Sequence, residues 1–187
     1  MNGRLIYVMG PSGAGKDSLL DALRQRLCGL PVAFPRRYIT RAASAGGEHH
    51  IPVSPEHFAA LVSQGYFSLY WASHGYRYGI AASTDTALAC GVSLIINGSR
   101  AAFPQARRRY PGLLPVLVTV EPSMLRERLI KRGRESEAEV EERLTAAFAP
   151  IPEEDAVEQW IRIDNSGPLE ENARNLAEKI TSALHLA

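Results

Sequence analysis

A glycine-rich turn followed by a lysine carries the clearest chemical signal in this sequence. Gly10-Pro11-Ser12-Gly13-Ala14-Gly15-Lys16 has the spacing G-x-x-x-x-G-K, between an apolar run at 5–9 and a helical pattern that begins at Ser18. Glycines lack a Cβ, so backbone N–H groups can point inward around an anion, and the helix N-terminus adds partial positive charge. Lys16 can then reach the β- and γ-phosphates of a nucleotide. The sequence therefore predicts that residues 10–18 bind ATP.

The residue after the lysine departs from the usual pattern, which has Ser or Thr there to bind Mg²⁺. Asp17 stands at this position, and Ser18 comes one residue later. We predict that the Asp17 carboxylate holds Mg²⁺ directly or through a water, because this hard cation keeps several of its waters. Alternatively, Asp17 is only the acidic residue that the first turn of a helix favours.

Composition indicates a single globular domain of ordinary character. The chain has 187 residues, 45% of them hydrophobic and 22% charged, with a net charge of +1 and two widely spaced cysteines. A net charge this small gives no general argument for nucleic acid or membrane partners. No disulfide framework, signal peptide or membrane-crossing run is expected, so the predicted compartment is a reducing cytoplasm.

Apolar strands alternate with amphipathic helices along the chain. Strands are predicted at 5–9, 32–34 continuing at 38–40, 66–72, 76–80, 92–96, 116–120 and 160–163, and helices at about 18–27, 54–65, 81–90, 101–110, 122–132, 136–148 and 168–184. This alternation predicts an α/β fold with a parallel sheet covered by helices. Ligands of such sheets bind beyond the carboxyl ends of the strands, which would place Lys16, Asn97 and residues 121–136 at one rim.

Further short motifs follow the loop in a fixed order. They are Thr40-Arg41, Trp71-Ala72, Tyr76-Arg77-Tyr78-Gly79 and the basic segment 128–133. In this order they resemble the guanylate kinase family over nearly the whole chain. The resemblance implies a P-loop NTPase core (1–34, 92–122 and 149–187), a small acceptor-binding α/β insertion (about 35–91) and a helical lid (about 123–148).

The departures from that family concern the groups that read guanine. Tyr70 stands where the family has a base-reading Glu, Ile80 where it has a hydroxyl residue, and Ile95-Ile96-Asn97 where it has D-x-D. His50 and Ser44 stand where the family has a Tyr and a second Arg. Phosphate-binding groups are kept better: Arg41, Tyr78 and either Arg36 or Arg37. A site that recognises the polar edge of a base by hydrogen bonds loses that recognition by ~10⁴-fold or more when its hydrogen-bonding groups are missing. We therefore expect a small, highly phosphorylated acceptor that has no base.

The loop with Asp17, together with Asn97-Gly98-Ser99-Arg100 at the end of a strand, is also similar to a related family, the ribose-bisphosphate kinases of phosphonate degradation. This resemblance implies transfer of phosphate from ATP to ribose 1,5-bisphosphate, giving 5-phosphoribosyl 1-diphosphate and ADP. The phosphosugar acceptor is taken from the resemblance and not from residue spacing.

Roles for the remaining candidates follow from charge and position. The predicted catalytic cations, which neutralise the transferring group, are Lys16, Arg132, Arg134 and Arg143. Asn165 is expected on the adenine side, and the predicted acceptor ligands are Arg41, Tyr78, Asn97, Arg100 and His50. The alternatives are a solvated basic face for the lid arginines, a loop salt bridge between Arg41 and Glu48, a core position for Tyr78 and a plain surface position for His50.

Three rival functions stay open at this stage. The first is a nucleoside monophosphate kinase with altered base choice, and the second is a small-sugar kinase of the gluconate type, which usually needs an acid near the acceptor oxygen. The third is an interaction module without activity, against which the intact lysine and lid arginines argue. The expected partners are small molecules, with no nucleic acid or membrane, and the chain is expected to be a monomer or a homodimer.

Overall fold

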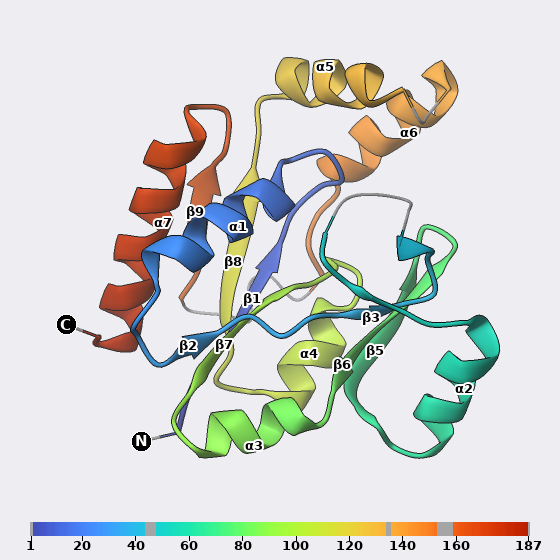
Figure 1. Cartoon of the computed structure of the whole chain (residues 1–187). Coiled ribbons are helices and arrows are strands. Elements are labelled where there is room, and N and C mark those ends of the chain that lie inside the picture. The colour runs from blue at the N-terminus through green and yellow to red at the C-terminus, as the bar shows by residue number, and fades with distance from the viewer. Residues whose placement is uncertain (1, 44–47, 134–135, 153–158, 187) are drawn as a thin grey trace. The chain divides into compact units, whose positions relative to one another are not determined.

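A computed structural model of the chain describes residues 2–43, 48–133, 136–152 and 159–186 (Figure 1). Its elements, in chain order, are β1 (Leu5–Met9), α1 (Lys16–Arg26), β2 (Val32–Ala33), β3 (Tyr38–Ile39), β4 (Ile51–Pro52), α2 (Pro55–Ser63), β5 (Phe67–Ser73), β6 (Tyr76–Ala81), α3 (Ser83–Ala89), β7 (Ser93–Asn97), α4 (Phe103–Arg109), β8 (Leu114–Thr119), α5 (Pro122–Arg132), α6 (Glu137–Ala147), β9 (Ile161–Asp164) and α7 (Leu169–Leu184).

The larger sheet has five strands in the order β2-β7-β1-β8-β9. The edge pairs β2–β7 and β8–β9 are parallel, with Val32 opposite Ser93 and Val116 opposite Ile161. β1 and β7 are buried along their whole length. A strand buried on both faces favours apolar residues on both, which explains why β1 and residues 94–96 of β7 are continuous apolar runs instead of alternating ones. The predicted α/β fold with a parallel core sheet is confirmed.

The smaller sheet has four strands in the order β4-β3-β6-β5. β5 and β6 form an antiparallel hairpin in which Trp71 faces Tyr78, while β3 pairs antiparallel with β6 and parallel with β4. The prediction that 32–34 and 38–40 form one strand is therefore wrong, because β2 belongs to the five-stranded sheet and β3 to this one. Pro35, between them, cannot donate a ladder hydrogen bond, which suits it to the break.

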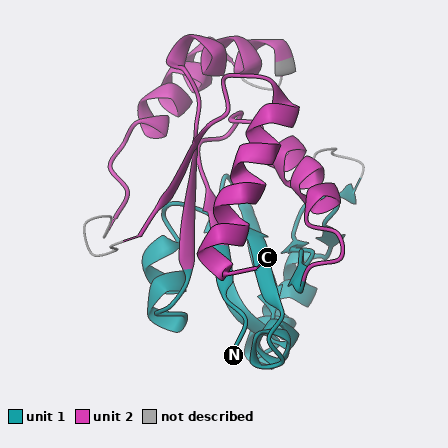
Figure 2. Ribbon diagram, turned by 90° about the vertical axis from the view of Figure 1, so that its left-hand side faces the viewer, with its two compact units in different colours: residues 1–6, 31–113 teal, residues 7–30, 114–187 magenta. Residues whose placement is uncertain are grey.

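The chain divides into two compact units (Figure 2). One unit comprises residues 1–6 and 31–113 and contains the four-stranded sheet with α2, α3, α4, β2 and β7. The other comprises residues 7–30 and 114–187 and contains α1, β8, β9 and the helices α5, α6 and α7. We call them the acceptor unit and the loop unit, after the candidate residues that each holds. The finer division into core, insertion and lid stays a prediction.

Helix ends follow the predicted capping chemistry. The Ser54 hydroxyl accepts from the backbone N–H of His57 at the start of α2, with Pro55 in the first turn. Ser136 and Glu139 form the predicted capping box of α6. Gly133 ends α5 in a left-handed conformation with a φ of 64°, which a residue with a Cβ adopts at a cost. These local signals therefore set where the helices that carry the lid arginines begin and end.

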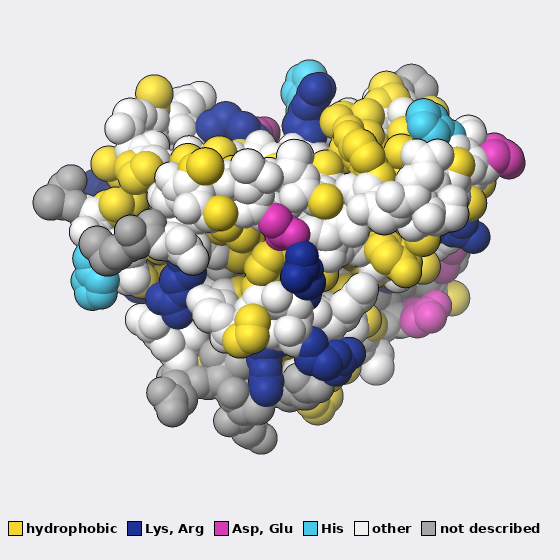
Figure 3. Space-filling model, turned by 90° about the horizontal axis from the view of Figure 1, so that it is seen from below, with side chains coloured by type: hydrophobic (Ala, Val, Ile, Leu, Met, Phe, Trp, Pro, Cys, Tyr) yellow, Lys and Arg dark blue, Asp and Glu magenta, His cyan; other side chains and the backbone are white. Residues whose placement is uncertain are grey.

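The visible surface is chemically mixed. On the face shown in Figure 3, Lys and Arg side chains are interspersed with apolar, uncharged and acidic groups, in keeping with the net charge of +1. In the part of the chain that the structure describes, no helix is both long enough and apolar enough to span a membrane.

Candidate active site

The phosphate loop joins β1 to α1 in the loop unit. Gly13 and Gly15 have φ of 88° and 80°, in the left-handed region that favours glycine. A Cβ on Gly10 would lie 2.3 Å from the carbonyl oxygen of Val118, and one on Gly15 would lie 2.6 Å from Nδ2 of Asn165. Both backbone conformation and close packing therefore require glycine here, as the motif predicted.

Lys16 lies over this loop. Its Nζ donates to the carbonyl oxygens of Gly10 and Pro11, each at 2.7 Å. The ammonium is therefore held on the loop by its backbone, in the turn where phosphate oxygens are expected to bind. This position suits the predicted role of Lys16 as a cation for the β- and γ-phosphates.

Two side-chain amides form a series of hydrogen bonds, which we call the brace, that supports the phosphate loop. Nδ2 of Asn165, at the end of β9, donates to the carbonyl oxygen of Ala14 at 2.7 Å. Asn172, buried on α7, donates in turn to Oδ1 of Asn165 at 3.0 Å. Arg128 on α5 donates to the backbone oxygen of Asn165 at 3.0 Å. Asn165 thus positions the phosphate loop, a role that the sequence did not suggest, while its adenine contact stays a prediction.

One lid arginine reaches the loop directly. Nη1 of Arg143, on α6, donates to the hydroxyl oxygen of Ser12 at 2.8 Å. On the neighbouring helix, Arg126 instead pairs with Glu141 at 3.0 Å and so ties α5 to α6. The contact to Ser12 favours a functional role for Arg143 over a solvated face. Arg134 lies outside the described residues, and the roles of Arg132 and Arg134 stay predictions.

Asp17 and Ser18 lie exposed in the first turn of α1. No group of three or more His, Cys, Asp or Glu side chains that could hold a metal ion occurs among the described residues. At a nucleotide site Mg²⁺ binds through one or two carboxylates together with substrate phosphates and waters. An exposed carboxylate directly after Lys16 fits this requirement, and the assignment of Asp17 stays a prediction.

Arg41 is the most distinctive side chain of the acceptor unit. Its Nε and Nη2 atoms are buried and have no hydrogen-bond partner among the residues that the structure describes. A buried donor without a partner costs about 1–3 kcal/mol, and more when it is charged. Among the described residues Glu48 pairs with Arg37, and no ion pair between Arg41 and Glu48, the predicted alternative, is found there. Two Arg41 donors therefore lack a partner among the described residues, which is the condition expected of a phosphate ligand before its ligand binds.

Tyr78 lies in a stack of aromatic and guanidinium groups. Its ring is parallel to that of Trp71, with a centroid distance of 5.5 Å and an interplanar angle of 7°. The Arg37 guanidinium carbon lies 4.9 Å from the Tyr78 ring centroid. Burial raises the pKa of Tyr78, although the charges of Arg37 and Arg41 act in the opposite direction. The hydroxyl therefore stays protonated near neutral pH and can donate to a phosphate oxygen.

His50 holds the backbone of its own loop. Its ring is buried, with Nδ1 lying 3.1 Å from the carbonyl oxygen of Glu48 and Nε2 lying 3.0 Å from that of Arg41. Both nitrogens thus face protein groups, which favours a structural role. Contact of His50 with an acceptor stays a prediction.

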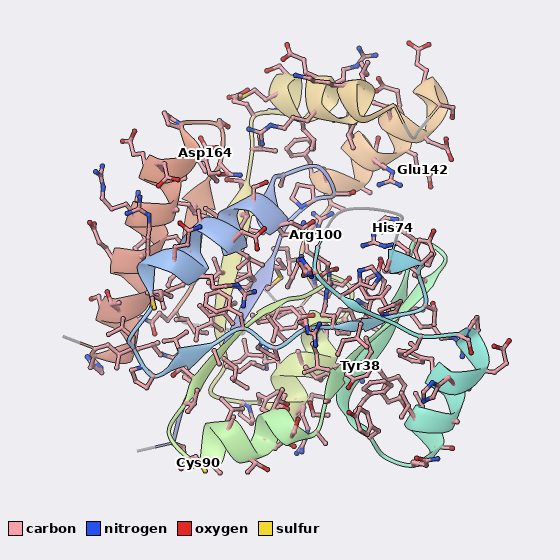
Figure 4. All side chains as sticks on the ribbon, viewed as in Figure 1. Tyr38, His74, Cys90, Arg100, Glu142 and Asp164 are labelled. Atoms are coloured by element: carbon pink, nitrogen blue, oxygen red, sulfur yellow. The ribbon has the colours of Figure 1, made fainter. Side chains whose placement is uncertain are left out.

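Two predicted acceptor ligands, Asn97 and Arg100, lie at or just after the end of β7. Asn97, the last residue of that strand, is buried, and its backbone oxygen accepts from Nη1 of Arg37 at 2.7 Å. Arg100 lies in the segment that joins β7 to α4 (Figure 4). Partial burial lowers the pKa of the Arg100 guanidinium, which remains charged at neutral pH. Asn97, Arg41 and Tyr78 thus lie in one unit, and Arg37 connects two of them.

Curated relatives identify the family. A ribose 1,5-bisphosphate phosphokinase PhnN from Desulfomicrobium baculatum is 49% identical over 93% of this chain and 92% of its own length. One from Azotobacter vinelandii is 47% identical over 96% of this chain and 97% of its own. The chain belongs to the ribose 1,5-bisphosphate phosphokinase family. The predicted relation to the kinases of this name is confirmed, and the protein is a phosphotransferase. No family model matches the chain.

Solved structures place this phosphokinase family member in a known fold class. A guanylate kinase from Anaplasma phagocytophilum aligns with a TM-score of 0.70 at 15% identity, covering 98% of this chain and 87% of the other. A gluconokinase from Sinorhizobium meliloti aligns with a TM-score of 0.51 at 21% identity, covering 97% of each chain. At these identities the likeness shows the fold alone, which confirms the predicted guanylate-kinase-like fold. Use of a nucleotide follows from membership in the phosphokinase family.

The sequence did not reveal the contacts that two residues of this phosphokinase site make. Asn172 appears only as one polar position in an amphipathic helix, and Arg37 is indicated, with Arg36, only as a phosphate-binding group. Their partners, Asn165 and Glu48, lie 7 and 11 residues away in sequence. Neither separation is the three or four residues that makes side chains neighbours within a helix. Only the folded structure shows these contacts.

Proposed function

We propose that the protein transfers the γ-phosphoryl group of ATP to ribose 1,5-bisphosphate, giving 5-phosphoribosyl 1-diphosphate and ADP. The observation that carries this proposal is the name shared by relatives that are 49% and 47% identical over almost the whole chain. The acceptor unit supports it independently. Two buried nitrogen atoms of Arg41 have no partner among the described residues, and Tyr70, Ile80 and Asn97 stand where guanylate kinases have groups that read the base.

The donor side is the phosphate loop. Backbone N–H groups between Gly10 and Lys16, the N-terminus of α1 and the Lys16 ammonium would surround the β- and γ-phosphates of ATP. Arg143, which already contacts Ser12, would neutralise charge on the transferring group together with Arg132 and Arg134. Bound Mg²⁺, held by Asp17 and the phosphates, would add further charge neutralisation.

The acceptor side needs no general base. An oxygen of the 1-phosphate is already anionic at neutral pH and forms the new bond to the γ-phosphorus. The bond from that phosphorus to the β,γ-bridging oxygen breaks, and ADP leaves with the electron pair. The protein then contributes alignment and charge neutralisation, which supply most of the catalysis in phosphoryl transfer. Arg41 and Tyr78 would orient a phosphate of the acceptor, and Asn97 and Arg100 would contact the rest of the molecule.

Product identification tests this proposal. The protein is incubated with ATP, Mg²⁺ and ribose 1,5-bisphosphate, and the products are identified by phosphorus NMR and mass spectrometry. A diphosphate ester at carbon 1 of the pentose, formed in equal amount to ADP, is expected. Brisk phosphorylation of GMP with no reaction of ribose 1,5-bisphosphate would overturn the proposal in favour of a nucleoside monophosphate kinase.

A gluconate-type kinase is the second candidate to be tested in the same assay. The likeness to a gluconokinase concerns the fold alone, since the identity is 21%. A hydroxyl acceptor usually needs an acid to take its proton. Glu48, an acidic residue in the loop of the predicted acceptor ligands, is bound by Arg37 through both carboxylate oxygens. The structure therefore gives this function no support.

A further inference from the structure

A buried ion pair lies among the predicted acceptor ligands. Nε of Arg37 donates to Oε2 of Glu48 at 2.9 Å, and Nη2 of Arg37 donates to Oε1 of the same carboxylate. The two side chains are only 10% and 17% exposed. A two-pronged contact of this kind is the strong form of a guanidinium–carboxylate pair, and loss of one partner leaves an uncompensated buried charge.

Arg37 also makes contacts beyond Glu48. Its Nη1 donates to the backbone oxygen of Asn97, so three of the five N–H donors of the guanidinium are bound within the protein. Its guanidinium carbon lies 4.9 Å from the centroid of the Tyr78 ring. Arg37 therefore connects the loop that carries Glu48 to the end of β7 and to Tyr78.

The Glu48 charge acts on the same region as the cations. The His50 ring lies between the backbone oxygens of Glu48 and Arg41, at 3.1 and 3.0 Å, so the two residues are neighbours in the loop. The charges of Arg37, Arg41 and Glu48 all act on the pKa of the Tyr78 hydroxyl. The Nε and Nη2 donors of Arg41 have no partner within the described part of the chain. An unpaired carboxylate at the position of Glu48 would cancel much of the Arg41 charge and would repel a phosphate dianion in a weakly screened site.

We propose that the Arg37–Glu48 pair determines acceptor specificity: Arg37 neutralises the buried Glu48 carboxylate and so keeps the surroundings of Arg41 and Tyr78 positive enough for an acceptor with two phosphate groups. The pair also occupies both oxygens of the carboxylate that could otherwise accept hydrogen bonds from a base edge. This inference rests on the proposed function, because it names a residue pair that adapts the same site to its substrate.

A double-mutant cycle tests the charge argument. Arg37→Ala is expected to raise the KM for ribose 1,5-bisphosphate by about ten- to a hundredfold, because it leaves Glu48 unpaired. Glu48→Gln alone is expected to change this KM by less than about threefold. Arg37→Ala/Glu48→Gln is expected to recover most of the loss. A double variant as weak as Arg37→Ala would overturn the proposal.

Comparison of two acceptors distinguishes an electrostatic role of Arg37 from a merely structural one. Binding of ribose 5-phosphate, which carries one phosphate, is measured alongside ribose 1,5-bisphosphate by calorimetry with an unreactive ATP analogue present. Arg37→Ala should weaken the bisphosphate more than the monophosphate, because repulsion grows with acceptor charge. Equal losses for both ligands would show a merely structural role. Arg77→Ala removes an exposed arginine of the same unit and serves as the matched control.

Failure of the proposed function gives a different result from failure of this inference. If the wild-type protein neither binds nor phosphorylates ribose 1,5-bisphosphate, the proposed function fails. The same four proteins are then titrated with inorganic pyrophosphate while the ATP analogue occupies the phosphate loop. Weakened binding in Arg37→Ala that is restored in the double variant supports the charge argument, and unchanged binding across the four proteins overturns it.

Discussion

At the scale of single residues, the acceptor unit shows a conflict between stability and binding. Arg41 has two buried donors that find no partner among the described residues, which is unfavourable for the protein without its ligand. Such groups recur at functional sites, where a ligand completes the hydrogen bonds. The sequence identified Arg41 through its resemblance to a family motif. The unpartnered donors now give a physical reason for the same assignment.

Substitution of Arg41 tests this reasoning through two independent measurements. Arg41→Met should raise the KM for the acceptor by about ten- to a hundredfold, since hydrogen bonds to charged groups contribute about 1.5–3 kcal/mol. The melting temperature should stay the same or rise, because the apolar chain removes a buried charge without a partner. Arg41→Lys should retain part of the binding as a point charge. A marked fall in melting temperature with unchanged acceptor KM would indicate a structural arginine instead.

Asp17 gives a second prediction at this scale. Asp17→Ala should raise the Mg²⁺ concentration required for half-maximal activity, because the variant lacks the carboxylate that helps to hold the ion. Asp21→Ala, which removes another exposed acid of α1, is the control and should leave the requirement unchanged. A Mg²⁺ titration of Asp17→Ala that overlays that of the wild type would leave Asp17 only its favourable position at the helix N-terminus.

At the scale of elements, the phosphate loop depends on side chains from α5, β9 and α7. The strand, the turn and the start of α1 could be predicted from the sequence, because their signals are local: an apolar run, glycines and a lysine at fixed spacing. The brace formed by Asn165 and Asn172 could not, because it joins segments that are distant from the loop in sequence. The division of 32–40 between two sheets was missed for the same reason, since strand pairing is a long-range property.

The brace predicts a selective effect on ATP. Asn172→Leu should leave Oδ1 of Asn165 without its donor and so weaken the hold of Asn165 on the carbonyl oxygen of Ala14 in the phosphate loop. The KM for ATP should then rise by about three- to thirtyfold, with little change in the KM for the acceptor. Asn175→Leu, an exposed position on the same helix, is the matched control. Equal changes in both KM values, or none in either, would show that the brace supports the fold and not the loop.

At the scale of the whole molecule, the candidate residues separate by ligand. Every described candidate for ATP lies in the loop unit, and every described candidate for the acceptor lies in the acceptor unit. The order of motifs along the sequence predicted this separation only in outline, because the units interleave: residues 7–30 belong with 114–187. Variants of one unit should therefore change the KM of one substrate, as the predictions for Arg41 and Asn172 require.

The pH dependence of turnover tests the chemistry that the two units perform together. The second ionisation of a phosphate monoester lies near pH 6, so the rate should rise through that region as the acceptor becomes a dianion. No enzyme base is needed, so the rate should then stay level to about pH 9. Burial raises the pKa of Tyr78 above its usual value near 10, which keeps its hydroxyl protonated as a donor across this range. The contrary result is a rate that still rises with pH when the acceptor is saturating and fully ionised, because such a rise must follow the ionisation of a group on the enzyme. It would show that a general base takes part and would favour a hydroxyl acceptor.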